Sequence, residues 1–130
     1  MIKKTIKFTD YFGKEREKEY MFHFTEAECV ELQFGTIGGL DALIKHIVEV
    51  EDMPSLISIF KDVVLKAYGT ISEDGLRFEK SEEARIAFSQ TPAYSILFME
   101  LARDAKAAAA FFEGVIPKNV NISKVSENAN

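Results

Sequence analysis

The sequence predicts a mostly helical α+β domain, in which an N-terminal β-hairpin is followed by about five helices. Residues 1–24 alternate between apolar and polar side chains, as strands with one buried face do. Beyond them, apolar residues recur at steps of three and four, which is typical of helices. With 130 residues, we expect a single globular domain over residues 1–117, divided into a hairpin (1–24) and a helical part (25–113) and followed by a flexible polar tail (118–130).

The hairpin pattern has two halves around the turn sequence D-Y-F-G. Its apolar positions are Ile2, Ile6 and Phe8 before the turn and Tyr20, Phe22 and Phe24 after it. A short turn that contains glycine suits two antiparallel strands. His23 falls between two of these apolar positions, so we expect an exposed histidine on the opposite face.

Three helices are predicted in the first part of the helical region. Thr25 and Glu28 have the spacing of a capping box, which predicts a helix over about 25–34. After Gly38 and Gly39, a second helix has one apolar face, formed by Leu40, Leu43, Ile44, Ile47 and Val48. A third begins near Pro54, and Gly69 can terminate it.

A turn and a short helix come next. Asp74 and Gly75 predict a tight turn that is followed by a brief extended piece. Ser81 is placed as the N-cap of a helix over 82–89, whose first residues are acidic and so favour the helix dipole. The core predicted from all these elements consists of Phe8, Phe22, Phe24, Phe60, Val64, Phe88, Leu97 and Leu101.

The last helix, predicted over about 92–113 between Pro92 and Gly114, has more apolar surface than one buried face needs. Its inward stripe is Phe98, Leu101, Ala105, Ala108, Ala109 and Phe112, and Met99 and Phe111 lie outside that stripe. Small residues allow another helix to approach closely, and aromatic and Met side chains are adaptable anchors. We therefore expect Phe98, Met99, Phe111 and Phe112 to bind another protein, either a second copy or a different chain. The alternative is a central helix that the domain itself covers.

Charge and composition exclude several classes of function. The net charge is −5 and the pI about 5.1, which disfavours nucleic-acid binding. The basic residues Lys3, Lys4 and Lys7 are expected to form a solvated strand face opposite the acids of the next strand. No stretch approaches the roughly 20 apolar residues of a membrane span, and the N-terminus does not resemble a signal peptide. Cys29 is the single cysteine and is interpreted as a packing residue in a reducing cytoplasm.

No catalytic constellation is evident, so we expect neither an enzyme nor a cofactor. The best metal candidates are His46 and Glu49, three residues apart on a predicted helix, together with Asp52, but no second histidine or cysteine lies near them. Ser89, Thr91 and Ser95 are hydroxyl residues near a helix start, where capping explains them. We predict no catalytic residue, no cofactor site and no metal site.

Three blocks of the sequence carry a family resemblance: the hairpin turn T-D-Y-F-G, the segment from Lys66 to Phe78 and the segment from Phe88 to Ala102. Together they resemble the tail assembly chaperones encoded in tail-gene clusters of siphophages and prophages of Gram-positive bacteria. The resemblance extends over residues 1 to about 118. It implies a non-catalytic protein, an oligomeric one in our interpretation, that binds the helical, apolar tape measure protein and keeps it soluble until tube subunits polymerise. It also implies the short form of a product that many such phages extend by translational frameshifting.

The resemblance further implies a location in the host cytoplasm and absence from the mature virion. An alternative is a structural tail component, such as a connector or tail-completion protein, that is incorporated into the particle. In that case the hairpin would offer an edge strand to neighbouring subunits.

Overall fold

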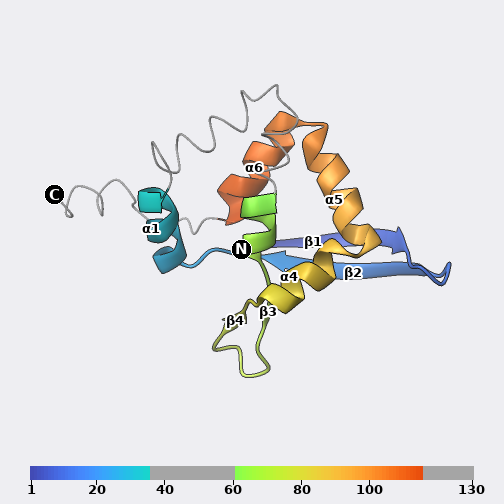
Figure 1. The fold of residues 1–130 in the computed structure, drawn as a ribbon, viewed down its shortest axis with the longest axis horizontal. Coiled ribbons are helices and arrows are strands. Elements are labelled where there is room, and N and C mark those ends of the chain that lie inside the picture. Colours follow the sequence, from blue (N-terminus) through green and yellow to red (C-terminus); the bar gives the residue numbers. More distant parts are fainter. Residues whose placement is uncertain (36–60, 116–130) are drawn as a thin grey trace.

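The computed structural model describes residues 1–35 and 61–115, and these residues form the predicted α+β fold (Figure 1). The strands and helices are β1 (Ile2–Thr9), β2 (Glu15–Phe22), α1 (Glu26–Gly35), β3 (Tyr68–Ile71), β4 (Phe78–Glu79), α4 (Glu82–Ser89), α5 (Pro92–Ala102) and α6 (Ala105–Val115). Residues 61–67 are also helical and lead directly into β3. The second predicted helix, residue Pro54 and the tail 118–130 lie outside the described residues.

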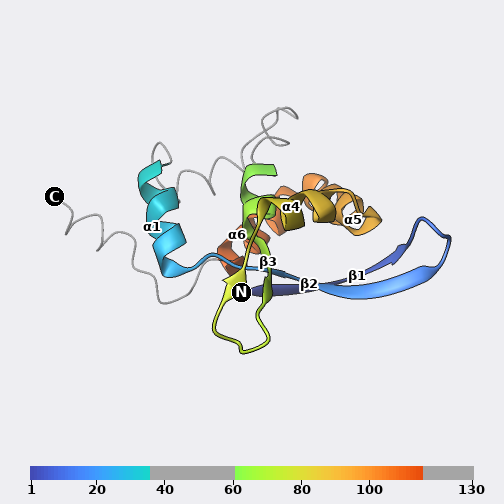
Figure 2. The same ribbon diagram turned by 60° about the horizontal axis from the view of Figure 1, so that its bottom comes forward.

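The strands form one antiparallel sheet with the order β1-β2-β3-β4. Strands β1 and β2 pair along their whole length, from Ile2 opposite Phe22 to Thr9 opposite Glu15. By contrast, β2 meets β3 only through Met21 opposite Gly69 and Phe22 opposite Tyr68. Figure 2 shows α4, α5 and α6 on one face of the long hairpin, whose outer end extends beyond them. The predicted hairpin is therefore confirmed as half of a larger sheet.

The core lies between the sheet and these helices. Of the predicted core residues, Phe22, Phe24, Val64, Phe88, Leu97 and Leu101 are buried, Phe8 is partly buried, and Phe60 lies outside the described residues. Aromatic rings dominate the centre: Tyr68 stacks on Phe88 with 4.5 Å between ring centroids, and Phe88 also contacts Tyr20 at 5.1 Å.

Local signals for caps and turns are confirmed. The Thr25 hydroxyl accepts the Glu28 amide at 3.1 Å, and the Glu28 carboxylate accepts the Thr25 amide at 2.9 Å. Ser81 caps α4 by accepting the Ala84 amide at 3.0 Å. Gly75 has φ +74 in the turn between β3 and β4.

Gly69 does not terminate a helix, and that prediction is wrong. The helix ends at Ala67, and Gly69 lies inside β3 with an ordinary negative φ. A Cβ atom at this position would come within 2.7 Å of the Glu79 carbonyl oxygen. Glycine thus allows β4 to approach β3 closely, which is a long-range requirement that local periodicity does not reveal.

The single long helix predicted over 92–113 is also wrong, because the chain bends after Ala102 and starts a new helix at Ala105 (Figure 1). Asp104 caps this second helix. Its carboxylate accepts the backbone amides of Lys106 at 3.0 Å and Ala107 at 3.1 Å. Gly114 lies inside α6, where a Cβ atom would meet the Ile2 side chain at 2.6 Å.

Candidate partner-binding surface

Helix α5 is apolar on nearly all sides. Ala93, Leu97 and Leu101 are buried against the rest of the domain. Ile96 and Met99, three residues apart, are 42% and 43% exposed. Because residues three apart lie on the same side of a helix, these two side chains form one outward apolar strip.

A shallow cavity of about 230 Å³ lies beside this strip and is lined by Lys61, Tyr94, Ser95, Phe98 and Met99. Two of the four predicted binding residues, Phe98 and Met99, are thus brought together. Phe98 is partly buried and packs against the core, whereas Met99 is 43% exposed. The cavity and the strip form what we call the α5 surface: Lys61, Tyr94, Ser95, Ile96, Phe98 and Met99.

The other two predicted binding residues are in the core. Phe111 is 6% exposed and Phe112 is 4% exposed. The Phe111 ring lies edge-on against Phe22, with 5.2 Å between ring centroids. The expectation that Phe111 projects outward is wrong because the bend at Asp104 rotates everything after it relative to α5. Much of the apparent apolar surplus of residues 98–112 is therefore covered by the domain itself.

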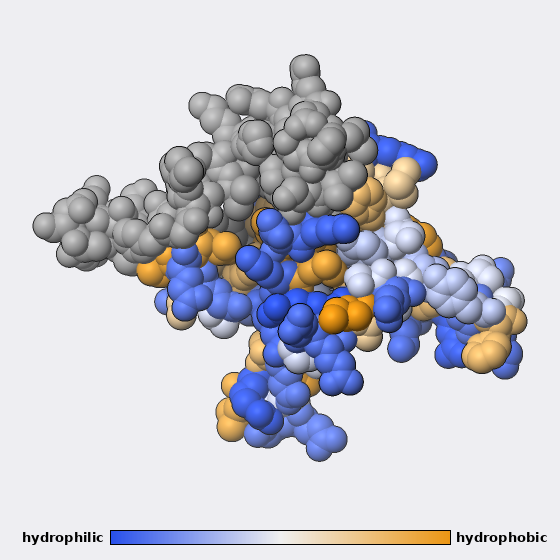
Figure 3. Space-filling view, viewed as in Figure 1, coloured by the Kyte–Doolittle hydropathy of each residue, from blue (hydrophilic) through white to orange (hydrophobic). Residues whose placement is uncertain are grey.

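The end of the β1–β2 hairpin is a second exposed apolar feature. Tyr11 is 84% exposed and Phe12 is 90% exposed, and in Figure 3 apolar colour appears among hydrophilic residues at this outer end of the molecule. The sequence signal was available, because the two central residues of a short turn between paired strands have no neighbouring strand to cover them. The turn was interpreted only as a structural marker, so the exposure of its two aromatic residues was missed.

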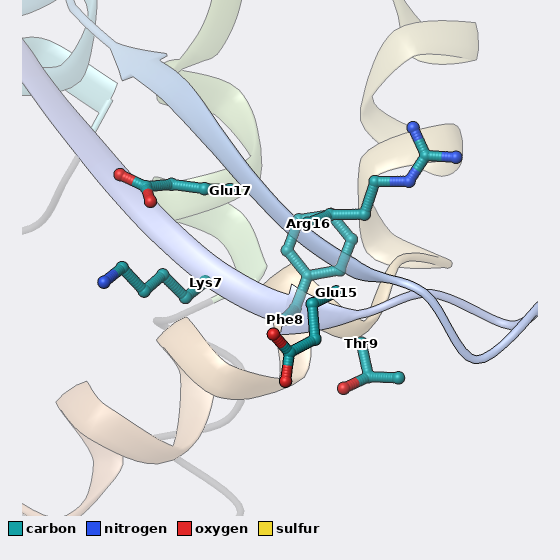
Figure 4. A pocket seen from close by; sticks show the side chains of 6 residues that line it. All are labelled: Lys7, Phe8, Thr9, Glu15, Arg16 and Glu17. Atoms are coloured by element: carbon teal, nitrogen blue, oxygen red, sulfur yellow. The ribbon is translucent and has the colours of Figure 1, made fainter.

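The outer half of the hairpin also lines a polar cavity of about 470 Å³, shown in Figure 4. Arg16 and Glu17, neighbours along β2, point in opposite directions. Lys7 lies opposite Glu17 in the strand register, as predicted, but Lys3 lies opposite Met21 and Lys4 opposite Tyr20, so the prediction for these two lysines is wrong. Lys4 differs: its ammonium group pairs with Glu100 of α5 at 2.6 Å. The face that carries the exposed Lys7 and Glu17 is solvated and charged, and it contrasts with the apolar α5 surface.

Several ionisable side chains near the sheet are partly or fully buried and contribute to the packing of the domain. Burial alone would raise the pKa of Glu28, but hydrogen bonds from Lys80 and the Thr25 amide hold it below the usual value. Lys80 binds Glu28 at 2.7 Å and lies 4.7 Å from the centre of the Phe24 ring. Cys29 is fully buried, and burial raises the pKa of its thiol. The interpretation of Cys29 as a packing residue is therefore confirmed.

His23 is not the exposed histidine that the strand alternation predicted. It is half-buried, and its ring lies edge-on to Phe78 with 5.7 Å between ring centroids. Burial lowers the pKa of its imidazole. Its Nδ1 atom is buried and has no hydrogen-bond partner within the part of the chain that the structure describes. The cause of the error is the short β3–β4 hairpin, which covers a face that would otherwise meet water.

Of the three hydroxyl residues near the start of α5, Thr91 is the N-cap of that helix, whereas Ser89 ends α4 and Ser95 lies inside α5. Thr91 accepts the Tyr94 amide at 3.2 Å and donates to the Phe88 carbonyl oxygen at 2.7 Å. Ser89 donates to the Ile86 carbonyl oxygen. Residues 1–35 and 61–115 contain no group of three or more His, Cys, Asp or Glu side chains placed to hold a metal ion. The metal candidates His46, Glu49 and Asp52 lie outside the described residues.

Comparison with known proteins identifies the family. A family model described as phage tail assembly chaperone matches residues 1–129. The chain belongs to the phage tail assembly chaperones. No curated protein and no solved structure matches this chaperone. The resemblance to phage tail assembly chaperones seen in the sequence is thereby confirmed. The description of the family points to a non-enzymatic role in building phage tails.

None of the helices in the described parts of this tail assembly chaperone has the length and apolar character needed to cross a membrane. Within residues 1–35 and 61–115, two surfaces combine exposed large apolar side chains with an adjoining cavity, and they are the α5 surface and the hairpin end. They differ in shape, since the α5 surface is a shallow hollow on a helix and the hairpin end is a projection.

Proposed function

We propose that this tail assembly chaperone binds the tape measure protein through the α5 surface and keeps it soluble until tail-tube subunits polymerise around it. Family membership supports the general role. The observation that carries the specific proposal is the exposure of Ile96 and Met99 beside an apolar hollow on a helix that is already buried on its other side.

The chemistry of the α5 surface suits an apolar helical partner. A helix that presents a stripe of large apolar side chains aggregates when the stripe is exposed to water. The flexible thioether chain of Met99 can adapt to such a stripe, and the hollow beside it can receive a side chain. The acidic net charge of −5 would keep the complex soluble.

The proposal includes the cellular setting. The chaperone acts in the host cytoplasm without catalysis and without a cofactor, and it leaves before the virion is complete. Binding at an apolar surface of modest size is compatible with such release, because small interfaces are typically transient.

Co-expression with the tape measure protein of the same phage tests the function. We expect the tape measure protein to be soluble with the chaperone and to aggregate without it. Met99→Glu should reduce the soluble fraction, because a charge in a dry contact has no partner to compensate its lost hydration. Ile86→Glu is the matched control, since Ile86 is 51% exposed on α4 and lies on another helix.

The two parts of the proposal can fail separately. A tape measure protein that is equally soluble with and without the chaperone would refute the function. If the Met99→Glu and Ile86→Glu chaperones solubilise the tape measure protein equally, only the choice of surface is refuted.

One observation favours the alternative of a structural tail component: β1 lies at the edge of the described sheet. However, its exposed residues include Lys3 and Lys7, and lysines on an edge strand typically prevent pairing with other strands. Mass spectrometry of purified virions distinguishes the two functions. A structural component would be present in fixed proportion to the tube protein, and we expect this chain to be absent.

A further inference from the structure

The exposed apolar strip of α5 is bordered by two basic side chains. Arg103 follows Ile96 by seven residues and Met99 by four, so it continues the line of these two side chains at the C-terminal end of α5. Lys61 comes from the helical residues before β3 and lines the cavity beside Met99. Both basic residues are exposed. The apolar strip therefore has one cation at its end and another beside its cavity.

These two cations have no ion-pair partner in the part of the chain that the structure describes, whereas nearby acids are engaged. Glu100 pairs with Lys4 at 2.6 Å. Asp104 accepts two backbone amides at the start of α6. Asp62 is exposed next to Lys61 in the sequence, but it does not line the cavity. The α5 surface thus presents unpaired positive charge on an acidic protein.

The distance over which charges act favours this local positive charge. The net charge of −5 repels an acidic partner at long range. At physiological ionic strength, however, exposed charges more than about 8 Å apart are largely screened from each other. One turn of helix separates Arg103 from Met99, a rise of about 6 Å. A partner that contacts Met99 therefore lies within reach of the nearby cations, while most of the acidic residues are screened.

We infer that the α5 surface selects an amphipathic helix whose apolar stripe is flanked by acidic residues, and that Lys61 and Arg103 determine this selectivity. The selectivity rests on the proposed function, because it names the chemistry of the partner helix at the same surface. The stripe would pack on Ile96 and Met99, and the flanking carboxylates would pair with the two cations. A helix with basic flanks would place like charges together at both positions, which is unfavourable.

The apolar strip and the two cations have different effects on binding. Exposed ion pairs add only modest affinity, so the strip supplies most of the affinity and the cations supply the discrimination. Two attractive pairs, compared with two like-charge contacts, should lower the dissociation constant by about 10-fold. Added salt should reduce this difference, because it screens exposed charges.

Two synthetic helical peptides test the selectivity. Both carry one tryptophan and the same stripe of leucines at i, i+3, i+4 and i+7, and the residues beside the stripe are glutamate in one peptide and lysine in the other. The chaperone has no tryptophan, so the fluorescence of the peptide reports binding to the full chain. In roughly 0.15 M salt, the acidic peptide should bind about 10-fold more tightly than the basic one. The net charge of the chain alone would give the opposite order.

Charge reversal tests the two residues that determine the selectivity. The double variant Lys61→Glu and Arg103→Glu should bind the basic peptide more tightly than the acidic one. Lys3→Glu together with Lys7→Glu is the matched control. It changes the net charge by the same amount at exposed positions of β1, and it should keep the preference for the acidic peptide. Thermal unfolding shows whether each variant is folded. A salt series on the wild type gives an independent measurement, since the difference between the peptides should disappear near 1 M salt.

Contrary results separate this selectivity from the proposed function. Equal binding of both peptides, tighter binding of the basic peptide, or a difference that salt does not reduce would refute selection by charge, even if the chaperone solubilises the tape measure protein. A preference that survives the Lys61 and Arg103 reversal, or that the β1 control also loses, would refute the role of these two residues. Selective peptide binding without solubilisation of the tape measure protein would refute the function and support the selectivity.

Discussion

Gly69 and Gly114 are required for space rather than for backbone conformation. Neither has a positive φ, but a Cβ atom at Gly69 would lie 2.7 Å from the Glu79 carbonyl oxygen, and one at Gly114 would lie 2.6 Å from Ile2 Cδ1. The atom that a Cβ at Gly69 would meet belongs to the backbone of a neighbouring strand. The atom that a Cβ at Gly114 would meet is the end of a flexible side chain, which can move.

We therefore predict that Gly69→Ala destabilises the fold by about 1–3 kcal/mol, as overpacking does, and that Gly114→Ala costs less. Urea denaturation of both variants and the wild type measures the difference in free energy of unfolding. Equal losses would show that the β3–β4 pair moves as easily as the Ile2 side chain.

His23 makes stability depend on pH. Its imidazole has a folded-state pKa below the usual value of 6.5, mainly because of burial and secondarily because the N-terminal ammonium group and Lys80 are near. When pH falls below about 6.5, the unfolded chain therefore takes up more protons at this residue than the folded chain does. The free energy of unfolding should decrease as a consequence.

We predict that His23→Gln flattens the decrease between about pH 6.5 and 5. The lowered pKa values of Glu28 and Asp10 act in a more acidic range, below their usual values of 4.5 and 3.8. Chemical denaturation at several pH values gives the comparison. The same slope in both proteins would mean that the folded and unfolded chains bind a proton at His23 equally well.

At the scale of elements, the bend between α5 and α6 depends on Asp104. Its carboxylate satisfies two amides at the start of α6, and its carbonyl oxygen accepts the Ala108 amide at 3.0 Å. Asp104→Ala should cost about 0.5–2 kcal/mol of stability, because N-cap replacement leaves these amides without a partner. Asp104→Asn retains an acceptor oxygen and should stay close to the wild type in thermal unfolding. Two equally stable variants would exclude a capping role.

Elements defined by local chemistry could be predicted from the sequence. Helix α4 begins after Ser81 and the first hairpin turns at Gly13, as expected, because a cap or a tight turn depends on residues a few positions apart. Strand β3 was missed, since Tyr68 continues the helical spacing of the residues before it and its strand partners lie far away in sequence.

The candidate site was predictable only in part, because some of its residues depend on contacts that are distant in sequence. Met99 is exposed as expected, but Phe111 is buried because Asp104 starts a new helix within an alanine-rich stretch that favours helix throughout. A helical wheel drawn across that bend assigns faces that the folded chain does not have. To predict that Phe111 is buried, one must also know that its ring packs against Phe22 of the sheet.

At the scale of the whole molecule, Cys29 can report on opening of the domain. It is the single cysteine of the chain and is 0% exposed, and its raised thiol pKa further lowers the amount of reactive thiolate. We predict that a thiol reagent labels the native protein at least ~1,000-fold more slowly than the urea-unfolded protein. Labelling should accelerate in subdenaturing urea. Fast labelling without urea would show that α1 separates readily from the core.

The sheet order has a consequence for how the protein folds. The β1–β2 and β3–β4 hairpins each pair residues that are near in sequence, whereas the seam between them joins Phe22 to Tyr68 and Met21 to Gly69. Closing that long loop costs entropy before its few contacts compensate. The seam should therefore limit the folding rate, and core substitutions at Phe22 should slow refolding more than substitutions at the hairpin ends. During synthesis, the β1–β2 and β3–β4 hairpins would then form first and pair with each other later.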